Sequence, residues 1–275
     1  MSVLFIHPVF AQSARLIVRG DDMGYTHSAN EALMESFRHG IVTTIEVMPV
    51  TPWFPETVKL LNENPQLDVG IHLSLTSEWT NLKWRPLTHA PSLTDSNGFF
   101  YPMVWENENY RGQALAEKDW KIQEIEAEVR AQIELALKNI PQISHISSHM
   151  GWTEMDSQVH SLIEKLAMEY DIDIDPKDFG VRILRFDGRT KTAKEKIENF
   201  VALLETLEPG ETYLFVDHPA FDTNEQRAIN HIGYLEVAAD RDGSVKMLTD
   251  PKVRQTIEHL DIQLINYIDL IHTKN

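Results

Sequence analysis

The chain has 275 residues, of which 42% are hydrophobic and 24% charged, an ordinary composition for a globular protein. Its formal net charge of −17 argues against a nucleic-acid partner, because no basic patch could outweigh that field, and suits a metal cation or a neutral substrate. It has no cysteine, so any transition-metal site must use histidine and carboxylate side chains, and no apolar run approaches the ~20 residues that cross a membrane.

The first residues resemble the second half of an export signal that ends at a small residue. They lack a basic N-terminal region, and His7-Pro8 interrupts the apolar run. We therefore interpret residues 1–14 as an N-terminal extension or a truncated signal segment. On this pattern we favour an exported, periplasmic location over a cytoplasmic one.

From residue 15 onward, short β-branched runs alternate with longer amphipathic runs, which is typical of βα units around a parallel sheet. Strands are expected at residues 16–19, 44–48, 68–75, 142–147, 181–186 and 212–216. Helices are expected at residues 28–40, 58–65, 120–139, 155–170 and 191–207. The tail leaves room for one more strand at 234–237 and a helix at 251–260.

An irregular stretch at residues 76–117 interrupts this alternation. It is rich in tryptophan, tyrosine and phenylalanine, and a long loop of this kind inside a compact domain is usually functional or mobile. Two interpretations stay open. The aromatic rings could stack on a substrate as a lid, or they could form an apolar cover over one end of the sheet.

The pattern predicts an α/β fold, and more narrowly a single-domain, complete or distorted (β/α) barrel of about seven strands that spans residues 15–275. Active sites of such barrels form at the C-terminal ends of the strands. Five acidic or imidazole side chains fall at or just past such ends: Asp21, Asp22, His72, His149 and His218. We therefore expect them to converge at one rim.

Each of these side chains also has an ordinary structural explanation. An aspartate after a strand can cap the next helix, His72 can be a satisfied core residue, and His218 can be a turn residue bound to backbone. His145 and His149 are four residues apart, a spacing that brings both to one metal on a helical turn. If His145 still belongs to the strand, its side chain faces a different way from that of His149, and only His149 would bind the metal. Aspartate with two histidines is nevertheless a common donor set for a catalytic divalent metal.

Four motifs occur in the order that is found in the YdjC-like carbohydrate deacetylases: residues 18–24, 70–73, 144–149 and 218–221. Residues 30–44 also resemble the first helix and second strand of that family. The resemblance extends from about residue 15 to residue 221. It implies a distorted (β/α) barrel and hydrolysis of an N-acetyl group from an acetylated sugar or oligosaccharide.

The same resemblance implies roles for individual residues. Asp22, His72 and His149 correspond to the ligands of one divalent metal ion, for which zinc and magnesium both stay open. Asp21 corresponds to the general base and His218 to the general acid.

The chain departs from the family around His149. Ser147 stands where relatives commonly carry an aspartate, and residues 150–154 replace a cluster of further histidines. Those positions would line the pocket, so the identity of the acetylated sugar stays open. Candidate substrate contacts are Arg185, His145, Trp152 and Trp79. Arg185 could instead orient Asp21 or be an ordinary surface residue.

Two other functions stay open. A metal-dependent amidohydrolase or phosphoesterase barrel would usually carry His-x-His on the first strand, where this chain has Asp21 and Asp22. A non-catalytic sugar-binding relative would not need both a base and an acid. The sequence also leaves a homodimer open.

Overall fold

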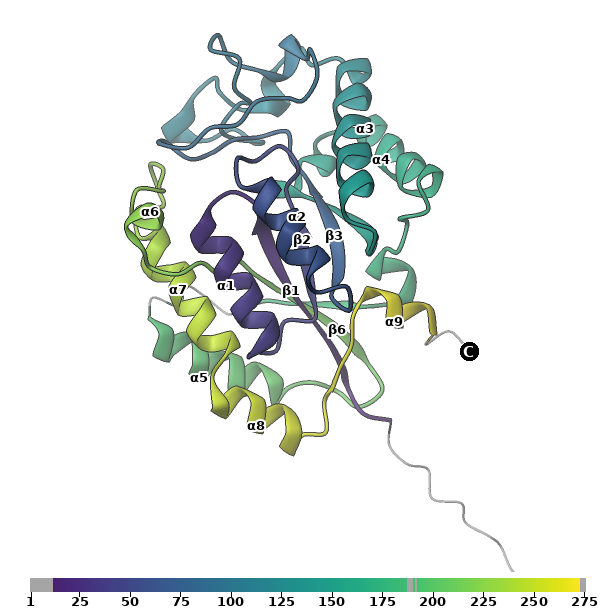
Figure 1. Ribbon diagram of the computed structural model, residues 1–275, viewed down its shortest axis with the longest axis vertical. Coiled ribbons are helices and arrows are strands. Elements are labelled where there is room, and N and C mark those ends of the chain that lie inside the picture. Colours follow the sequence, from purple (N-terminus) through teal and green to yellow (C-terminus); the bar gives the residue numbers. More distant parts are fainter. Residues whose placement is uncertain (1–11, 187–189, 191, 273–275) are drawn as a thin grey trace, which may run out of the picture.

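A twisted parallel sheet forms the centre of the computed structural model, which describes residues 12–186, 190 and 192–272 (Figure 1). The interpretation of residues 1–14 as an extension or signal falls mostly on residues 1–11, which lie outside the described residues. In the part of the chain that is described, no helix is long and apolar enough to cross a membrane.

The strand order is β4-β3-β2-β1-β6-β5, with β7 paired to the start of β1, and every pair is parallel. Among the described residues, β4 and β5 do not pair, and a cavity of about 710 Å³ lies between them. The sheet is thus a distorted barrel with an open seam. The strands are β1 Arg15–Met23, β2 Thr44–Val47, β3 Asp68–Leu73, β4 Ile143–Ser148, β5 Arg182–Leu184, β6 Thr212–Asp217 and β7 Gln263–Leu264.

Helices cover the outside of the sheet (Figure 1). Helix α5 packs on α7 and α8, and α3 packs on α4. Strands β1, β2 and β3 and most of β6 are buried, as expected of a parallel sheet covered by helices, whereas β5 at the open seam is largely exposed. The helices are α1 His27–Arg38, α2 Phe54–Asn62, α3 Ile122–Asn139, α4 Ser157–Glu169, α5 Ala193–Leu204, α6 Asn224–Arg227, α7 Val237–Leu248, α8 Pro251–His259 and α9 Tyr267–His272.

Residues 74–121 contain no strand and cross the C-terminal end of the sheet (Figure 1). Three short 3₁₀ turns punctuate them, at Pro91–Leu93, Glu108–Tyr110 and Leu115–Glu117. Trp79 and Trp84 are buried in one core cluster with residues of β3 and α3. These two rings therefore pack inward as an apolar cover.

The predicted fold class is confirmed, with differences in particular elements. Strand β1 continues through Met23, whereas we expected it to end at Arg19. The expected strand at 234–237 is wrong, because Val237 begins α7. The sequence did not indicate α7, since Arg241, Gly243 and Ser244 are buried among its apolar residues and interrupt the periodic apolar stripe. The strand β7 and the helix α9 were also missed, and both are short.

The end of α1 supplies a test of the packing. A Cβ at Gly40 would lie 2.4 Å from the carbonyl oxygen of Ser36 and 2.6 Å from that of Leu248. Backbone atoms cannot move aside as a side chain can, so we predict that Gly40→Ala lowers the free energy of unfolding by about 1–3 kcal/mol, measured in urea. The control is Gly243→Ala, whose Cβ would lie 3.3 Å from the flexible Lys196 side chain and no nearer than 3.6 Å to the backbone, at Ala193 Cα. Equal losses in the two variants would contradict this explanation.

Candidate metal centre

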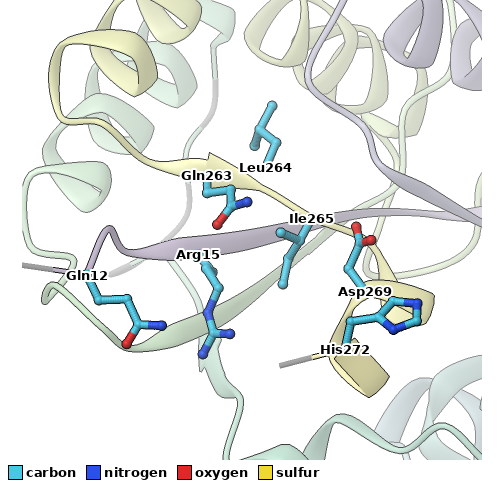
Figure 2. Close-up of a pocket in the computed structure, with 7 residues that line it drawn as sticks. All are labelled: Gln12, Arg15, Gln263, Leu264, Ile265, Asp269 and His272. Atoms are coloured by element: carbon cyan, nitrogen blue, oxygen red, sulfur yellow. The ribbon is translucent and has the colours of Figure 1, made fainter. Parts of the chain in front are cut away.

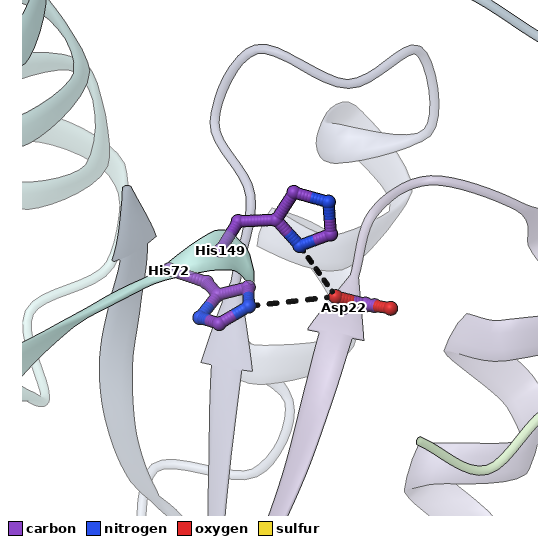
Figure 3. A group of neighbouring side chains, drawn as sticks. All are labelled: Asp22, His72 and His149. Atoms are coloured by element: carbon purple, nitrogen blue, oxygen red, sulfur yellow. Dashed lines mark ion pairs between the residues drawn. The ribbon is translucent and has the colours of Figure 1, made fainter. Parts of the chain in front are cut away.

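Asp22, His72 and His149 meet at the C-terminal ends of β1, β3 and β4 (Figure 3). Asp22 Oδ1 lies 3.2 Å from His149 Nδ1 and 3.5 Å from His72 Nε2. One ligand atom of each residue lies within 4.8 Å of the other two, and all three side chains are buried. Donors at ~2.0–2.2 Å from a tetrahedral metal stand about 3.3 Å apart, so this group has the size of a metal site.

The chemistry of the group also fits a cation. Asp22 Oδ1 is buried and has no hydrogen-bond donor, although it faces two imidazole rings. Leaving a buried carboxylate oxygen without a hydrogen bond is costly, and a divalent metal between this oxygen and the two rings would satisfy it. One carboxylate and two imidazoles are also three protein ligands, the number that a catalytic zinc ion usually takes.

An irregularity in β1 brings both aspartates to the same place. The pairing of β1 with β2 shifts between Gly20 and Met23, and Asp22 has a φ of 72°, in the left-handed region. Successive side chains of a regular strand point to opposite faces, whereas here both carboxylates lie within 4.0 Å of His72 Nε2. A non-glycine residue in this region costs roughly 1–2 kcal/mol, so the surrounding structure must hold Asp22 there.

Two further carboxylates hold the histidines, and the sequence reasoning missed both. Glu78 Oε2 lies 3.0 Å from His149 Nε2. His72 Nδ1 lies 2.7 Å from the hydroxyl of Ser147, which donates to Glu46 Oε2 at 2.6 Å. A signal for Glu46 was present, because a carboxylate stands between the apolar residues Ile45 and Val47 of strand β2. Glu78 carried no such signal.

Asp21 is held by an arginine from its own strand. Arg19 donates to both carboxylate oxygens, from Nε at 2.8 Å and from Nη2 at 3.0 Å. We had considered Arg185 for this task, but Arg185 is exposed and lines the cavity between β4 and β5. Asp21 Oδ2 also lies 3.8 Å from His72 Nε2, so this carboxylate stands directly beside the candidate ligands.

His218 follows the last residue of β6, the strand that pairs with β1, and so lies beside Asp21. Its Nε2 lies 4.0 Å from Asp21 Oδ2, and its side chain is 42% exposed, whereas the three candidate ligands are buried. Its backbone N–H donates to Asp217 Oδ1 at 2.8 Å. The imidazole is therefore the part of the group that solvent and a substrate can reach.

The charges around the three candidate ligands determine their protonation. Burial alone raises the pKa of Asp22, but the guanidinium of Arg241, assisted by His218 and His149, holds that pKa well below its usual value. Burial alone lowers the pKa of His149, but Glu78 and Asp22 raise it to about 10. The pKa of His72 is lowered, chiefly by burial. A metal that binds here therefore displaces a proton from His149.

Arg241 is a third element of the site that the sequence reasoning missed. It comes from α7, and its Nη2 lies 2.8 Å from Asp22 Oδ2. The guanidinium is buried and lies over the rings of Tyr25 and Trp79, at 4.9 and 5.1 Å from their centroids. Arg241 thus takes one oxygen of Asp22 and leaves the other directed at the histidines.

The remaining sequence candidates are buried. His145 is fully buried, stacks on Tyr267 with ring centroids 3.5 Å apart, and contacts Glu46. Trp152 is also fully buried and donates from Nε1 to the carbonyl of Leu73 at 2.8 Å. Trp79 is 2% exposed. In this structure these three side chains leave no surface for a sugar.

A second cavity, of about 380 Å³, lies near the opposite end of the sheet (Figure 2). It is lined by Arg15 at the start of β1, by Gln263 and by His272. Strand β1 rises ~3.3 Å per residue, so the length of the strand separates Arg15 from Asp22. This cavity is therefore remote from the candidate ligands.

The contact between Asp22 and Arg241 supplies a test. Removal of one partner of a buried ion pair leaves the other charge uncompensated, so we predict that Arg241→Met costs about 3–5 kcal/mol in the unfolding free energy of metal-free protein. In the double variant with Asp22→Asn, the two losses should be less than additive, because no buried carboxylate then remains unpaired. Urea unfolding at pH 7 measures all three variants, and strictly additive losses would show that the pair is not coupled.

Several known proteins match this chain along nearly its whole length, including the following three. A carbohydrate deacetylase of Geobacillus stearothermophilus is 29% identical over 91% of this chain and 96% of its own length. A carbohydrate deacetylase of Enterococcus faecalis is 28% identical over 93% and 98%. The crystal structure of an Enterococcus faecalis V583 protein, described as a proposed cellobiose-phosphate cleavage protein, covers 94% of this chain and 99% of its own. Its TM-score of 0.73 at 24% identity shows that the fold is shared.

The family described as YdjC-like protein matches residues 15–259. This match begins at the first residue of β1 and ends at the last residue of α8, so it includes every residue of the candidate site. The family that the four sequence motifs indicated is thereby confirmed. The chain belongs to the YdjC-like family.

Proposed function

We propose that this chain is a metal-dependent hydrolase that removes an N-acetyl group from an acetylated sugar or oligosaccharide. The observation that carries the proposal is the buried group of Asp22, His72 and His149, in which Asp22 Oδ1 lacks a donor. A second carboxylate and an exposed imidazole stand beside it. The deacetylases that match the chain over nearly their whole length support the same reaction.

The three candidate ligands would hold the metal through Asp22 Oδ1, His72 Nε2 and His149 Nδ1. A divalent metal in such a site lowers the pKa of water towards ~7 and polarises the acetyl carbonyl. The arrangement leaves Asp21 outside this set. Because Arg19 occupies both of its oxygens from one side, Asp21 is held in one orientation beside the ligands.

Asp21 serves as the general base in this proposal. It accepts a proton from the water that attacks the acetyl carbon, while the carbonyl becomes tetrahedral. His218 serves as the general acid. An amide nitrogen leaves only as a neutral amine, so the imidazole donates a proton to nitrogen as the C–N bond breaks, and acetate and the free amino sugar are the products.

Metal content and substrate range test the proposal together. The purified protein would be analysed for bound metal, stripped with a chelator and reloaded, and then screened for acetate release from acetylated monosaccharides and oligosaccharides. We expect acetate release from at least one such sugar, with loss of activity on stripping and recovery on reloading. Activity that is indifferent to the chelator would overturn the metal-dependent reaction.

Substitution of Asp21 and substitution of Asp22 should have different effects on metal content and on turnover. We predict that Asp21→Asn retains the metal but lowers kcat by roughly 10²–10⁴-fold, because it removes a general base. Asp22→Asn should lower the metal content itself. Metal analysis alongside acetate-release rates distinguishes the two, and unchanged turnover in metal-loaded Asp21→Asn would place the base elsewhere.

Replacement of His218 should affect poor leaving groups most. We predict that His218→Gln leaves metal occupancy intact and slows amide substrates far more than activated aryl acetate esters, whose leaving group needs no proton. The ratio of the two losses isolates proton donation from other roles. Equal losses on both substrates would instead indicate that His218 contributes to binding of the reacting carbonyl.

A further inference from the structure

Glu46 is a buried carboxylate that the proposed reaction does not use. It lies in the middle of β2 and its side chain has no exposed surface. Burial alone raises its pKa, but His145 and Arg19 lower that pKa to about 2, so the group is a carboxylate at neutral pH. A buried charge of this kind is costly unless its oxygens are satisfied, which raises the question of what it holds.

Its two oxygens have different partners. Oε1 lies 2.6 Å from Nε2 of His145. Oε2 accepts a hydrogen bond of 2.6 Å from the hydroxyl of Ser147. The Ser147 oxygen in turn lies 2.7 Å from Nδ1 of His72. Glu46 is therefore joined to a candidate metal ligand through one serine.

The positions of the protons between Glu46, Ser147 and His72 follow from which of these groups can donate a hydrogen bond. A carboxylate can only accept, so the single hydroxyl proton of Ser147 is directed at Glu46. The Ser147 oxygen must then accept from His72, which places the ring proton of His72 on Nδ1. The lone pair of His72 is left on Nε2, the atom that lies 3.5 Å from Asp22 Oδ1.

Gly70 makes this reach across the sheet sterically feasible. In the sheet, Glu46 pairs with Gly70 of β3, and Gly70 pairs with His145 of β4. A Cβ at Gly70 would lie 2.5 Å from both carboxylate oxygens of Glu46. The missing side chain thus allows the carboxylate to extend over β3 to Ser147, which is the neighbour of His72 in the register.

We infer that Glu46, acting through Ser147, is a positioning residue that fixes the tautomer and ring orientation of His72 for metal binding. This inference rests on the proposed metal site and adds two residues to it. Removal of a partner that orients a metal ligand in this way typically lowers metal affinity by about 10–100-fold.

The test measures Zn²⁺ affinity by competition with a chromophoric chelator, using the full chain. We expect Glu46→Gln and Ser147→Ala each to weaken Zn²⁺ binding by about 10–100-fold, and the double variant to lose little more, because both act through one contact. In Glu46→Gln, the further change Ser147→Asp should recover most of the affinity, since that carboxylate can accept directly from His72 Nδ1.

A matched control is Glu128→Gln. Glu128 is also fully buried and accepts hydrogen bonds from Leu87 and Thr88, but it belongs to α3 and contacts none of the candidate ligands. We expect its substitution to leave Zn²⁺ affinity unchanged. Glu46→Gln could fail to fold. Ser147→Ala removes only a hydroxyl group, so it still tests the inference in that case.

An independent readout is the tautomer of His72 in metal-free protein, from ¹⁵N shifts of the imidazole nitrogens. We expect the Nδ1–H form in the wild type and a mixture of tautomers in Ser147→Ala. Wild-type protein that binds neither Zn²⁺ nor Mg²⁺ would overturn the proposed function and this inference with it. Zn²⁺ binding in the wild type that Ser147→Ala does not weaken would overturn the inference alone.

Discussion

The burial of four carboxylates at one end of the sheet is the constraint on which the rest of the site depends. Asp21, Asp22, Glu46 and Glu78 are each at most 4% exposed. Buried charges must be paired, and two arginines supply part of the compensation, Arg19 to Asp21 and Arg241 to Asp22. The rest falls to the imidazole groups, and the raised pKa of His149 is the result. A divalent cation bound at the candidate site would replace that proton with charge at the centre of the group.

This arrangement explains why the backbone of β1 is irregular where the carboxylates stand. A regular strand would direct Asp21 and Asp22 to opposite faces, and one of them would be buried against apolar helices without a partner. The shift in pairing and the left-handed conformation of Asp22 bring both to His72. Local backbone strain is thus offset by the ion pairs that the strain makes possible.

Hydrogen bonds around His72 show how the site accommodates a serine at position 147. Ser147 occupies a position at which the resemblance led us to expect an aspartate. In the structure its hydroxyl connects His72 to Glu46, so a carboxylate still supports this histidine from another strand. His72 therefore has a carboxylate behind it without an aspartate at position 147.

The sequence by itself determined the fold class, the family and the five side chains of the rim, because each depends on local periodicity or on order along the chain. The alternation of strands and helices places Asp21, Asp22, His72, His149 and His218 at strand ends, where a parallel sheet gathers them. Only the tertiary structure decided which partners they have. Arg241 approaches from a helix near the other end of the chain, and Glu46 reaches Ser147, and through it His72, across a glycine. The sequence likewise did not determine that His145 and Trp152 are buried. Periodicity predicts which face of a strand or helix a side chain lies on, but not what packs against that face.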